Sequence, residues 1–320
     1  MSAVRKSVLG RKALLSAGAA VMVLAGVLTG CGSETAPRAL AMGSSGSAVD
    51  TVMAQIYAGA LRHAGAVVST EVRVGDDRRL LAEMGRTEVD LFPSFTGRLL
   101  SQLAPTLTST TPDDVYVDLN HSLPEGISVG DPTPVTNTPE LVVSTRLASG
   151  SGVSDLSACS RLPADLPTVV VDPPTDSLLR AFADAGCRLG PLQRVVGVQS
   201  VVDRVASGGA VGILTPLQVS GVTSSGSAGA VQALATPKIT KSSPATPTST
   251  PSVPVPSVGP RAEVLVPVYR TAALSPDQVK AINKVAGEIS TADLVALARR
   301  VESGENPADV ATGWLGEHSI

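Results

Sequence analysis

The chain has 320 residues, a net charge of −3 at neutral pH and a hydrophobic content of 43%, but only 2% of its residues are aromatic. This length exceeds what one small hydrophobic core usually holds, which favours two lobes. The slightly acidic balance argues against a nucleic acid or an anionic membrane face as the main partner, because both attract basic surfaces.

Residues 1–30 have the pattern of a secretory signal peptide. Basic residues gather at positions 5–12, and the apolar run 13–28 that follows is too short to span a membrane comfortably. No second long apolar run occurs in the sequence. We therefore expect an exported protein.

The tetrapeptide Leu-Thr-Gly-Cys at 28–31 resembles a bacterial lipobox. The resemblance implies cleavage before Cys31 and attachment of lipid to Cys31. The lipid would anchor the protein to the outer face of the cell membrane, since two or more alkyl chains hold where one does not. Residues 31–38 then form a short flexible tether. The alternative is an ordinary signal peptide with a chance cysteine.

The exported part begins with alternating strand and helix patterns. An apolar run at 38–43 leads to Ser-Ser-Gly-Ser at 44–47, and apolar residues from Val49 to Leu61 then recur at helical spacing until Gly65. The next segments favour a strand at 66–75, a helix at 76–87, a strand at 88–92 and a helix at 96–104. Alternation of this kind predicts a parallel sheet with right-handed crossovers.

Two polar loops follow strands of this sheet. Ligands bind to open α/β sheets beyond the carboxyl ends of the strands, where helix N-termini offer free amide groups. The loops at 44–47 and 93–97 lie at such ends. For 44–47, capping of the following helix alone and capping combined with ligand contact are both left open.

A second α/β region begins near position 138. Strand and helix patterns alternate again at 138–148, 165–174, 175–186, 192–198, 200–209 and 210–214. Cys159 and Cys187 both lie in this region. We expect a disulfide between them in an oxidising compartment, and two buried free thiols are the alternative. Their spacing excludes a redox Cys-x-x-Cys motif or a zinc site.

The composition changes sharply at 236–261, where prolines alternate with serine and threonine, and this insertion is expected to be disordered. A strand pattern returns at 262–270. Trp314, the only tryptophan, is expected in the core rather than at a ligand. Three capped helices close the chain, and they begin at Ser275, Ser290 and Asn306.

The sequence lacks the motifs that usually carry catalysis. The three histidines stand apart, and none has a histidine or cysteine at metal-ligand spacing. There is no Gly-x-Ser-x-Gly elbow, P-loop or Gly-x-Gly-x-x-Gly motif. Asp90, Asp172 and Asp176 occupy turns or strand ends, where carboxylates usually act as caps. A binding module without a metal or cofactor is favoured over an enzyme.

Four segments share the patterns of one known family. They are the strand, loop and helix at 42–65, the strand with Pro, Phe and Thr-Gly at 89–100, the segment 130–144 and the C-terminal helices at 266–318. On these segments the chain resembles the substrate-binding proteins of osmoprotectant ABC importers, which capture glycine betaine, choline, carnitine or proline betaine. The resemblance covers roughly residues 38–320, apart from the insertion.

The resemblance implies an α/β, two-lobed fold of the type II periplasmic-binding-protein class, with parallel-rich sheets flanked by helices and a hinge between the lobes. Lobe 1 would comprise 39–137 and 215–320, and lobe 2 would comprise 138–214. The ligand would lie between the lobes, where the family holds a quaternary ammonium in a box of aromatic rings.

The family's binding residues carry over only in part. Phe95 falls on the position of a box tyrosine, Thr96 and Gly97 match the next two residues, and Arg98 replaces a small hydroxyl residue. Our leading hypothesis is that Phe95 covers the apolar or cationic end of the ligand and that Arg98, although it departs from the family, pairs with the ligand carboxylate. Core packing is the alternative for Phe95, whereas Phe92 is expected to be a core anchor.

Other positions depart further from the family. A loop lysine of the family corresponds to Ser44 or Ser45, and Asn137 falls near a polar ligand contact. Pro139 stands where another aromatic is expected, and two further segments that usually present an aromatic lack one, at 212–218 and 262–268. These losses suggest either a ligand more polar than betaine or weak binding.

Together these features favour a monomeric, lipid-anchored solute-binding protein. It would capture a small osmoprotectant-like solute, such as a betaine, and deliver it to an ABC permease and its ATPase by shifting a hinge equilibrium. The alternative is a degenerate solute-binding-fold lipoprotein that acts as a cell-envelope interaction protein without a transport ligand.

Overall fold

A computed structural model of the protein describes residues 38–222, 228–236 and 258–320. The expected signal peptide, the lipidation site Cys31 and nearly all of the 31–38 tether and the 236–261 insertion lie outside the described residues. Within the described ranges, no helix has the length and apolar character needed to cross a membrane.

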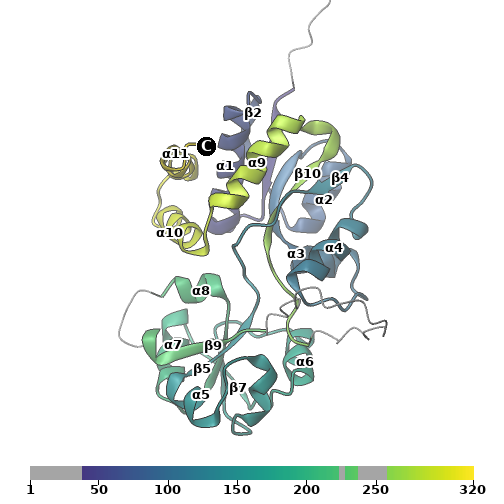
Figure 1. Ribbon diagram of the computed structural model, residues 1–320. Coiled ribbons are helices and arrows are strands. Elements are labelled where there is room, and N and C mark those ends of the chain that lie inside the picture. The colour runs from purple at the N-terminus through teal and green to yellow at the C-terminus, as the bar shows by residue number, and fades with distance from the viewer. Residues whose placement is uncertain (1–37, 223–227, 237–257) are drawn as a thin grey trace, which may run out of the picture. The chain divides into compact units, whose positions relative to one another are not determined.

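The first of two five-stranded sheets has the order β2-β1-β3-β10-β4 (Figure 1). Strand β1 pairs in parallel with β2 and β3, whereas β10 pairs antiparallel with β3 and β4. The strands are β1 (Leu40–Ser44), β2 (Val68–Val74), β3 (Leu91–Phe95), β4 (Ile127–Val129) and β10 (Leu265–Arg270).

Helices cover both faces of this sheet because its strands alternate their side chains between two cores. On β3, Leu91 faces one core and Phe92 faces the other. The first core lies under α1 (Ala48–His63), α9 (Pro276–Glu288), α10 (Thr291–Glu302) and α11 (Pro307–Glu317), and α1 packs against the other three. The second core lies under α2 (Asp77–Gly85), α3 (Thr96–Leu103) and α4 (Pro112–Ser122).

The second sheet has the order β7-β6-β8-β5-β9 and repeats the mixed pairing of the first. Its strands are β5 (Glu140–Ser144), β6 (Thr168–Val170), β7 (Leu192–Arg194), β8 (Val211–Leu214) and β9 (Val231–Leu234). It is accompanied by α5 (Thr145–Ser151), α6 (Asp176–Asp184), α7 (Val198–Ala206), α8 (Pro216–Ser220) and the 3₁₀ turns η1 (Leu156–Arg161) and η2 (Ala228–Ala230).

The parallel sheet predicted for the strands of 38–104 is confirmed across β2, β1 and β3, and the chain returns from the second sheet to add β10 in the opposite direction. Two expectations need correction. Strand β3 continues through Pro93 to Phe95 instead of ending at Phe92. Pro93 is tolerated in the strand because the residue opposite it is also a proline, Pro267, so neither leaves an N–H donor unpaired. The segment 215–320 was expected to belong to lobe 1 throughout. Strand β9 instead pairs with β5, so residues 231–234 belong to the second sheet.

Two chain segments connect the residues of the two sheets and run side by side. Thr136 and Val264 form an antiparallel bridge. The Asn137 backbone N–H donates to the Glu263 carbonyl at 2.8 Å, and the Glu263 N–H donates to Thr138 Oγ1 at 2.9 Å. The outgoing and returning segments are therefore hydrogen-bonded to each other at the crossing.

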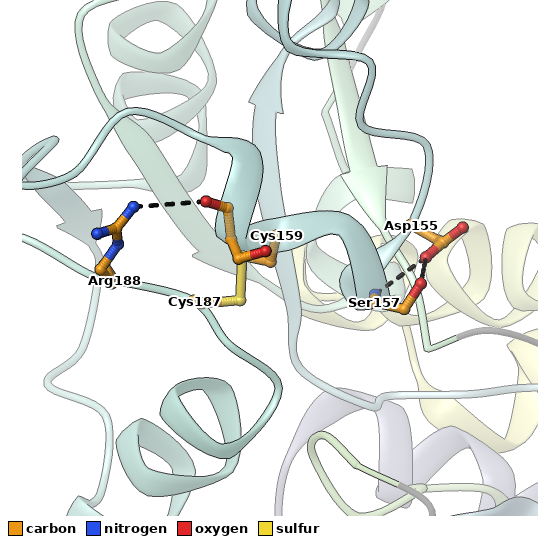
Figure 2. The surroundings of a disulfide bond; sticks show 6 residues. Asp155, Ser157, Cys159, Cys187 and Arg188 are labelled. Atoms are coloured by element: carbon orange, nitrogen blue, oxygen red, sulfur yellow. Dashed lines mark hydrogen bonds between the residues drawn. A yellow bond between two sulfur atoms is a disulfide. The ribbon is translucent and has the colours of Figure 1, made fainter.

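A disulfide joins Cys159 and Cys187 across a sequence separation of 28 residues (Figure 2). Both cysteines are buried in the core of the second sheet. Nearby, the Asp155 carboxylate caps η1 by accepting from the Ser157 backbone N–H at 2.9 Å. Closing a loop of this length stabilises a fold by about 3–4 kcal/mol on the chain-entropy account.

The C-terminal helices begin where the sequence predicts. Ser275 and Ser290 form capping boxes with Gln278 and Asp293, and Asn306 caps the last helix. Trp314 is 3% exposed and Phe92 is fully buried, so both are core residues as expected.

Candidate functional site

A cavity of about 530 Å³ opens beside the carboxyl ends of β1 and β3. Its wall is built from the N-terminus of α1, the junction of β3 and α3, the crossing segment at Asn137, and residues of α7, α8 and α10. The polar residues of this wall are Ser45, Ser47, Asp50, Arg98, Asn137, Thr215, Gln218, Arg299 and Glu302.

The N-terminus of α1 places a buried carboxylate on this wall. Ser47 is the N-cap residue and accepts from the Asp50 backbone N–H at 3.1 Å. Asp50 is 1% exposed, and its Oδ2 atom accepts a hydrogen bond from Ser45 Oγ. Its Oδ1 atom is buried and has no hydrogen-bond partner among the described residues. Asp50 therefore lines the cavity and carries one buried acceptor that no described residue satisfies.

Arg98 provides the counter-charge for two buried carboxylates. Its Nε and Nη2 atoms donate to Asp77 Oδ2 and Oδ1 at 2.8 and 3.1 Å, and Nη2 lies 3.5 Å from Asp50 Oδ2. Ser94 Oγ also donates to Asp77, at 2.9 Å. Burial raises the pKa of Asp50, and the charge of Arg98 opposes that rise. The expected pairing of Arg98 with a ligand carboxylate is thus limited to Nη1, because the other two nitrogens are engaged.

Phe95 combines the two roles that the sequence left open. Its ring is 3% exposed and belongs to the core beneath α1, yet it also lines the cavity. The guanidinium carbon of Arg98 lies 5.5 Å from the centroid of the Phe95 ring. One ring face is therefore already covered by a cation of the protein itself. Among the described residues that line the cavity, Phe95 is the one aromatic.

Three of the expected site residues do not line the cavity but hold its frame. Thr96 Oγ1 donates to the Ala262 carbonyl at 3.3 Å and accepts from the Val264 N–H at 3.1 Å. A Cβ on Gly97 would lie 2.4 Å from the same Ala262 carbonyl oxygen, so no side chain fits there. Ser44 is fully buried and shares a hydrogen bond with Thr51 at 3.1 Å. Close packing accounts for these three residues without a ligand.

The other expected residues, Ser45 and Asn137, do line the cavity. The Asn137 backbone is fixed by its hydrogen bond to Glu263, and its side-chain Oδ1 is buried without a partner among the described residues. Asn137 is therefore a second cavity-lining residue with a buried polar atom that no described residue satisfies.

Sequence reasoning missed several wall residues that lie far from the motifs. Asp50 follows Ser47 by three residues, which is the spacing of an ordinary capping pair and so hid its second role. Arg299 lies in the last turn of α10, where a basic residue complements the helix dipole. Gln218 and Thr215 form a capping box at α8. No spacing rule connects these three elements, because only the tertiary fold brings them together.

Arg299 differs from its neighbour in having no ion-pair or hydrogen-bond partner within the described part of the chain. Arg300, the next residue, pairs with Glu305 at 2.7 Å. A Cβ on Gly221 would lie 3.7 Å from Arg299 Nη2, so the guanidinium reaches the end of α8. The cavity wall therefore carries one uncommitted cation.

A smaller cavity of about 120 Å³ adjoins the first through Thr215 and Gln218. Its wall is mainly apolar and includes Pro139, at the position where the family resemblance implies an aromatic. Across the ranges that the structure describes, no group of three or more His, Cys, Asp or Glu side chains is arranged to hold a metal ion.

Residues 38–176 match the family model described as the substrate binding domain of the ABC-type glycine betaine transport system. The resemblance to this family is confirmed. The match covers less than half of the 320 residues. The members of this family are solute-binding domains rather than enzymes. A comparison with curated proteins gave no significant match.

Two solved structures resemble the chain over 88% of its length and 98% of theirs. Apo YehZ from Escherichia coli superposes with a TM-score of 0.63 at 18% identity. A glycine betaine/carnitine/choline ABC transporter protein superposes with a TM-score of 0.64 at 14% identity. At these identities the likeness concerns the fold, which is that of type II periplasmic binding proteins, as the sequence predicts.

Proposed function

We propose that the protein is the solute-binding component of an ABC importer and captures one small polar solute in the cavity of about 530 Å³. The observation that carries this proposal is the wall itself. It joins the ends of β1 and β3 to α7 and α8, and two of its buried polar atoms, Asp50 Oδ1 and Asn137 Oδ1, lack partners among the described residues. Buried polar atoms of this kind are normally satisfied, so a bound solute is the natural partner.

The mechanism we propose uses the crossing segments as a hinge. The segments around Thr136 and Val264 are the connection between the residues of the two sheets, and their mutual hydrogen bonds keep them together. The lobes would comprise 39–137 with the C-terminal part from about 258, and 138–234. A solute that contacts both lobes would bind the closed arrangement more tightly than the open one and would therefore stabilise it.

The same proposal includes export and anchoring. Cleavage before Cys31 and its lipidation would leave the binding unit tethered at the outer face of the membrane, next to the permease and its ATPase. The alternative is an envelope protein without a transport solute. It is supported by the presence of one aromatic residue, Phe95, among the described residues of the wall.

Calorimetric titration tests the proposal. The full chain in detergent would be titrated with glycine betaine, choline, carnitine, proline and a panel of polar metabolites. We expect one solute to bind at micromolar affinity, which corresponds to about −8 kcal/mol. Asn137→Ala should weaken that binding at least tenfold, whereas Asn120→Ala, on the exposed side of α4, should not change it. Absence of binding by every solute would favour the alternative.

A further inference from the structure

The charged groups on the cavity wall indicate which end of a solute would lie where. Asp50 Oδ2 already accepts from Ser45 and lies near Arg98, but Oδ1 of the same carboxylate is buried and unpaired within the described residues. A buried carboxylate oxygen loses its hydrogen bonds to water. The free-energy cost of that loss is compensated only if a hydrogen-bond donor takes the place of the water. The partner that Oδ1 lacks is therefore a hydrogen-bond donor, and a cationic donor would bind this carboxylate more strongly than a neutral one.

The cavity wall has few aromatic rings with which to bind a quaternary ammonium, a cation that has no N–H. A quaternary ammonium is held chiefly by ring faces, and Phe95 is the one ring among the described wall residues. Arg98 already lies over that ring at 5.5 Å. A quaternary nitrogen also donates no hydrogen bond, so it would leave Asp50 Oδ1 unsatisfied.

The opposite charge is available on α10. Arg299 lines the cavity and has no ion-pair or hydrogen-bond partner in the described ranges, whereas Arg300 is paired with Glu305. A guanidinium binds a carboxylate through paired N–H donors. The wall thus presents a buried carboxylate with one unpartnered oxygen, Asp50 Oδ1, and a guanidinium without a partner in the described ranges, Arg299. These two groups can meet the opposite charges of a zwitterion.

We propose that the solute is a zwitterion whose cationic nitrogen keeps at least one N–H, as in a primary or secondary amino acid, with Asp50 binding the ammonium and Arg299 binding the carboxylate. This inference rests on the proposed function and narrows its solute class. It places a fully methylated betaine among the weaker ligands of this cavity.

Matched pairs that differ only in N-methylation test the ammonium half. The full chain in detergent would be titrated with proline against proline betaine, and with glycine, sarcosine and dimethylglycine against glycine betaine. We expect the N–H member of each binding pair to bind at least tenfold more tightly. Tighter binding by the methylated members would overturn the inference but leave the proposed function standing. Binding by no amine, while another polar solute binds, would overturn the inference alone. Binding by no solute of any class would overturn both.

Variants test the two anchoring residues. Asp50→Asn should lower affinity for the N–H ligand at least tenfold and change affinity for its methylated partner less than threefold, with Asp113→Asn on the exposed start of α4 as the control. Equal losses for both partners would contradict a donor-specific role for Asp50.

Arg299→Gln should weaken binding of proline at least tenfold without affecting pyrrolidine, which lacks the carboxylate. Arg300→Gln is the matched control on the adjacent residue, because its partner Glu305 lies outside the cavity wall. Unchanged proline affinity in Arg299→Gln would overturn the assignment of the carboxylate.

Discussion

Two buried aspartates near the first sheet, Asp90 and Asp50, differ in whether both carboxylate oxygens have hydrogen-bond partners. Asp90 accepts from Arg270 Nη1 at 2.6 Å, from Arg38 Nη2 at 3.0 Å and from the Ala41 backbone N–H at 2.8 Å, so both of its oxygens are paired. Asp50 is equally inaccessible, but its Oδ1 has no partner among the described residues. The comparison separates a carboxylate that holds the sheet together from one that keeps an unpartnered oxygen in the described chain.

The largest expected effect is at Asp90. Asp90→Ala leaves Arg270, whose side chain is 20% exposed, without its partner and frees the Ala41 N–H, so the free energy of unfolding should fall by about 3–5 kcal/mol. Urea unfolding followed by circular dichroism measures it. Asp172→Ala is the control, because Asp172 is 78% exposed and its pair with Arg194 should contribute at most about 0.5 kcal/mol. Equal losses in the two variants would refute the structural role of Asp90.

Arg98 contacts two buried carboxylates, those of Asp77 and Asp50. Arg98→Met removes the counter-charge of Asp77 and Asp50, and we expect a loss of about 2–3 kcal/mol at pH 7, reduced because Arg98 is 37% exposed. The loss should shrink as the pH falls, since burial raises the pKa of Asp50 and protonation removes that charge. Urea unfolding at pH 7 and at a series of lower pH values measures it.

Arg86→Met, which breaks only an exposed pair with Glu88, is the control for Arg98→Met. A pH-independent loss would contradict the expected cause. Because Arg98 also supports the fold, weaker solute binding in Arg98→Met would not by itself identify a ligand contact.

Glu263 at the crossing should show a pH effect of opposite sign to that of a paired carboxylate. Burial raises its pKa from 4.5 to about 7, although its hydrogen bond from the Arg98 backbone N–H opposes the rise. The folded protein therefore holds the proton more tightly than the unfolded chain does, and stability is lost as the pH rises from about 4.5 to 7.

Glu263→Gln imitates the protonated form and should raise the free energy of unfolding at pH 8 by about 2 kcal/mol, with little effect at pH 4. Chemical denaturation over this pH range measures the difference. Glu305→Gln should show no such gain, because Arg300 lowers the pKa of that exposed carboxyl. A destabilised Glu263→Gln at pH 8 would show that the negative charge is needed at the crossing.

Asp50→Asn should have the smallest effect on stability, within about 1 kcal/mol of the original protein at pH 7. The change removes a charge that burial disfavours, while Arg98 keeps its paired contact with Asp77. Thermal unfolding measures it. A large loss would mean that Asp50, like Asp90, serves the fold, and would weaken its assignment to a solute.

The helices and their caps were largely predictable because their signals are local. The apolar spacing from Val49 to Leu61 and the caps Ser275, Ser290 and Asn306 depend on residues within one turn of each other. Strand direction was not predictable in this way. The antiparallel placement of β10 and the transfer of β9 to the second sheet depend on where a distant segment returns, which no local pattern records.

The site was predictable where it coincides with a motif. Phe95, Arg98, Ser45 and Asn137 were expected from the resemblance and lie on the cavity wall, whereas Thr96, Gly97 and Ser44 hold the frame behind it. Whether any of them contacts a solute remains a prediction.

By itself, the sequence determined the α/β class, the starts of the three C-terminal helices and the family resemblance, because these depend on periodicity, capping and matched segments. The tertiary structure decided which charges meet. It committed Arg98 to Asp77, covered one face of Phe95 with that guanidinium, and left Asp50 Oδ1 and Arg299 on the cavity wall without partners in the described chain. Pairing of charges depends on distances between elements far apart in sequence, and folding alone sets those distances.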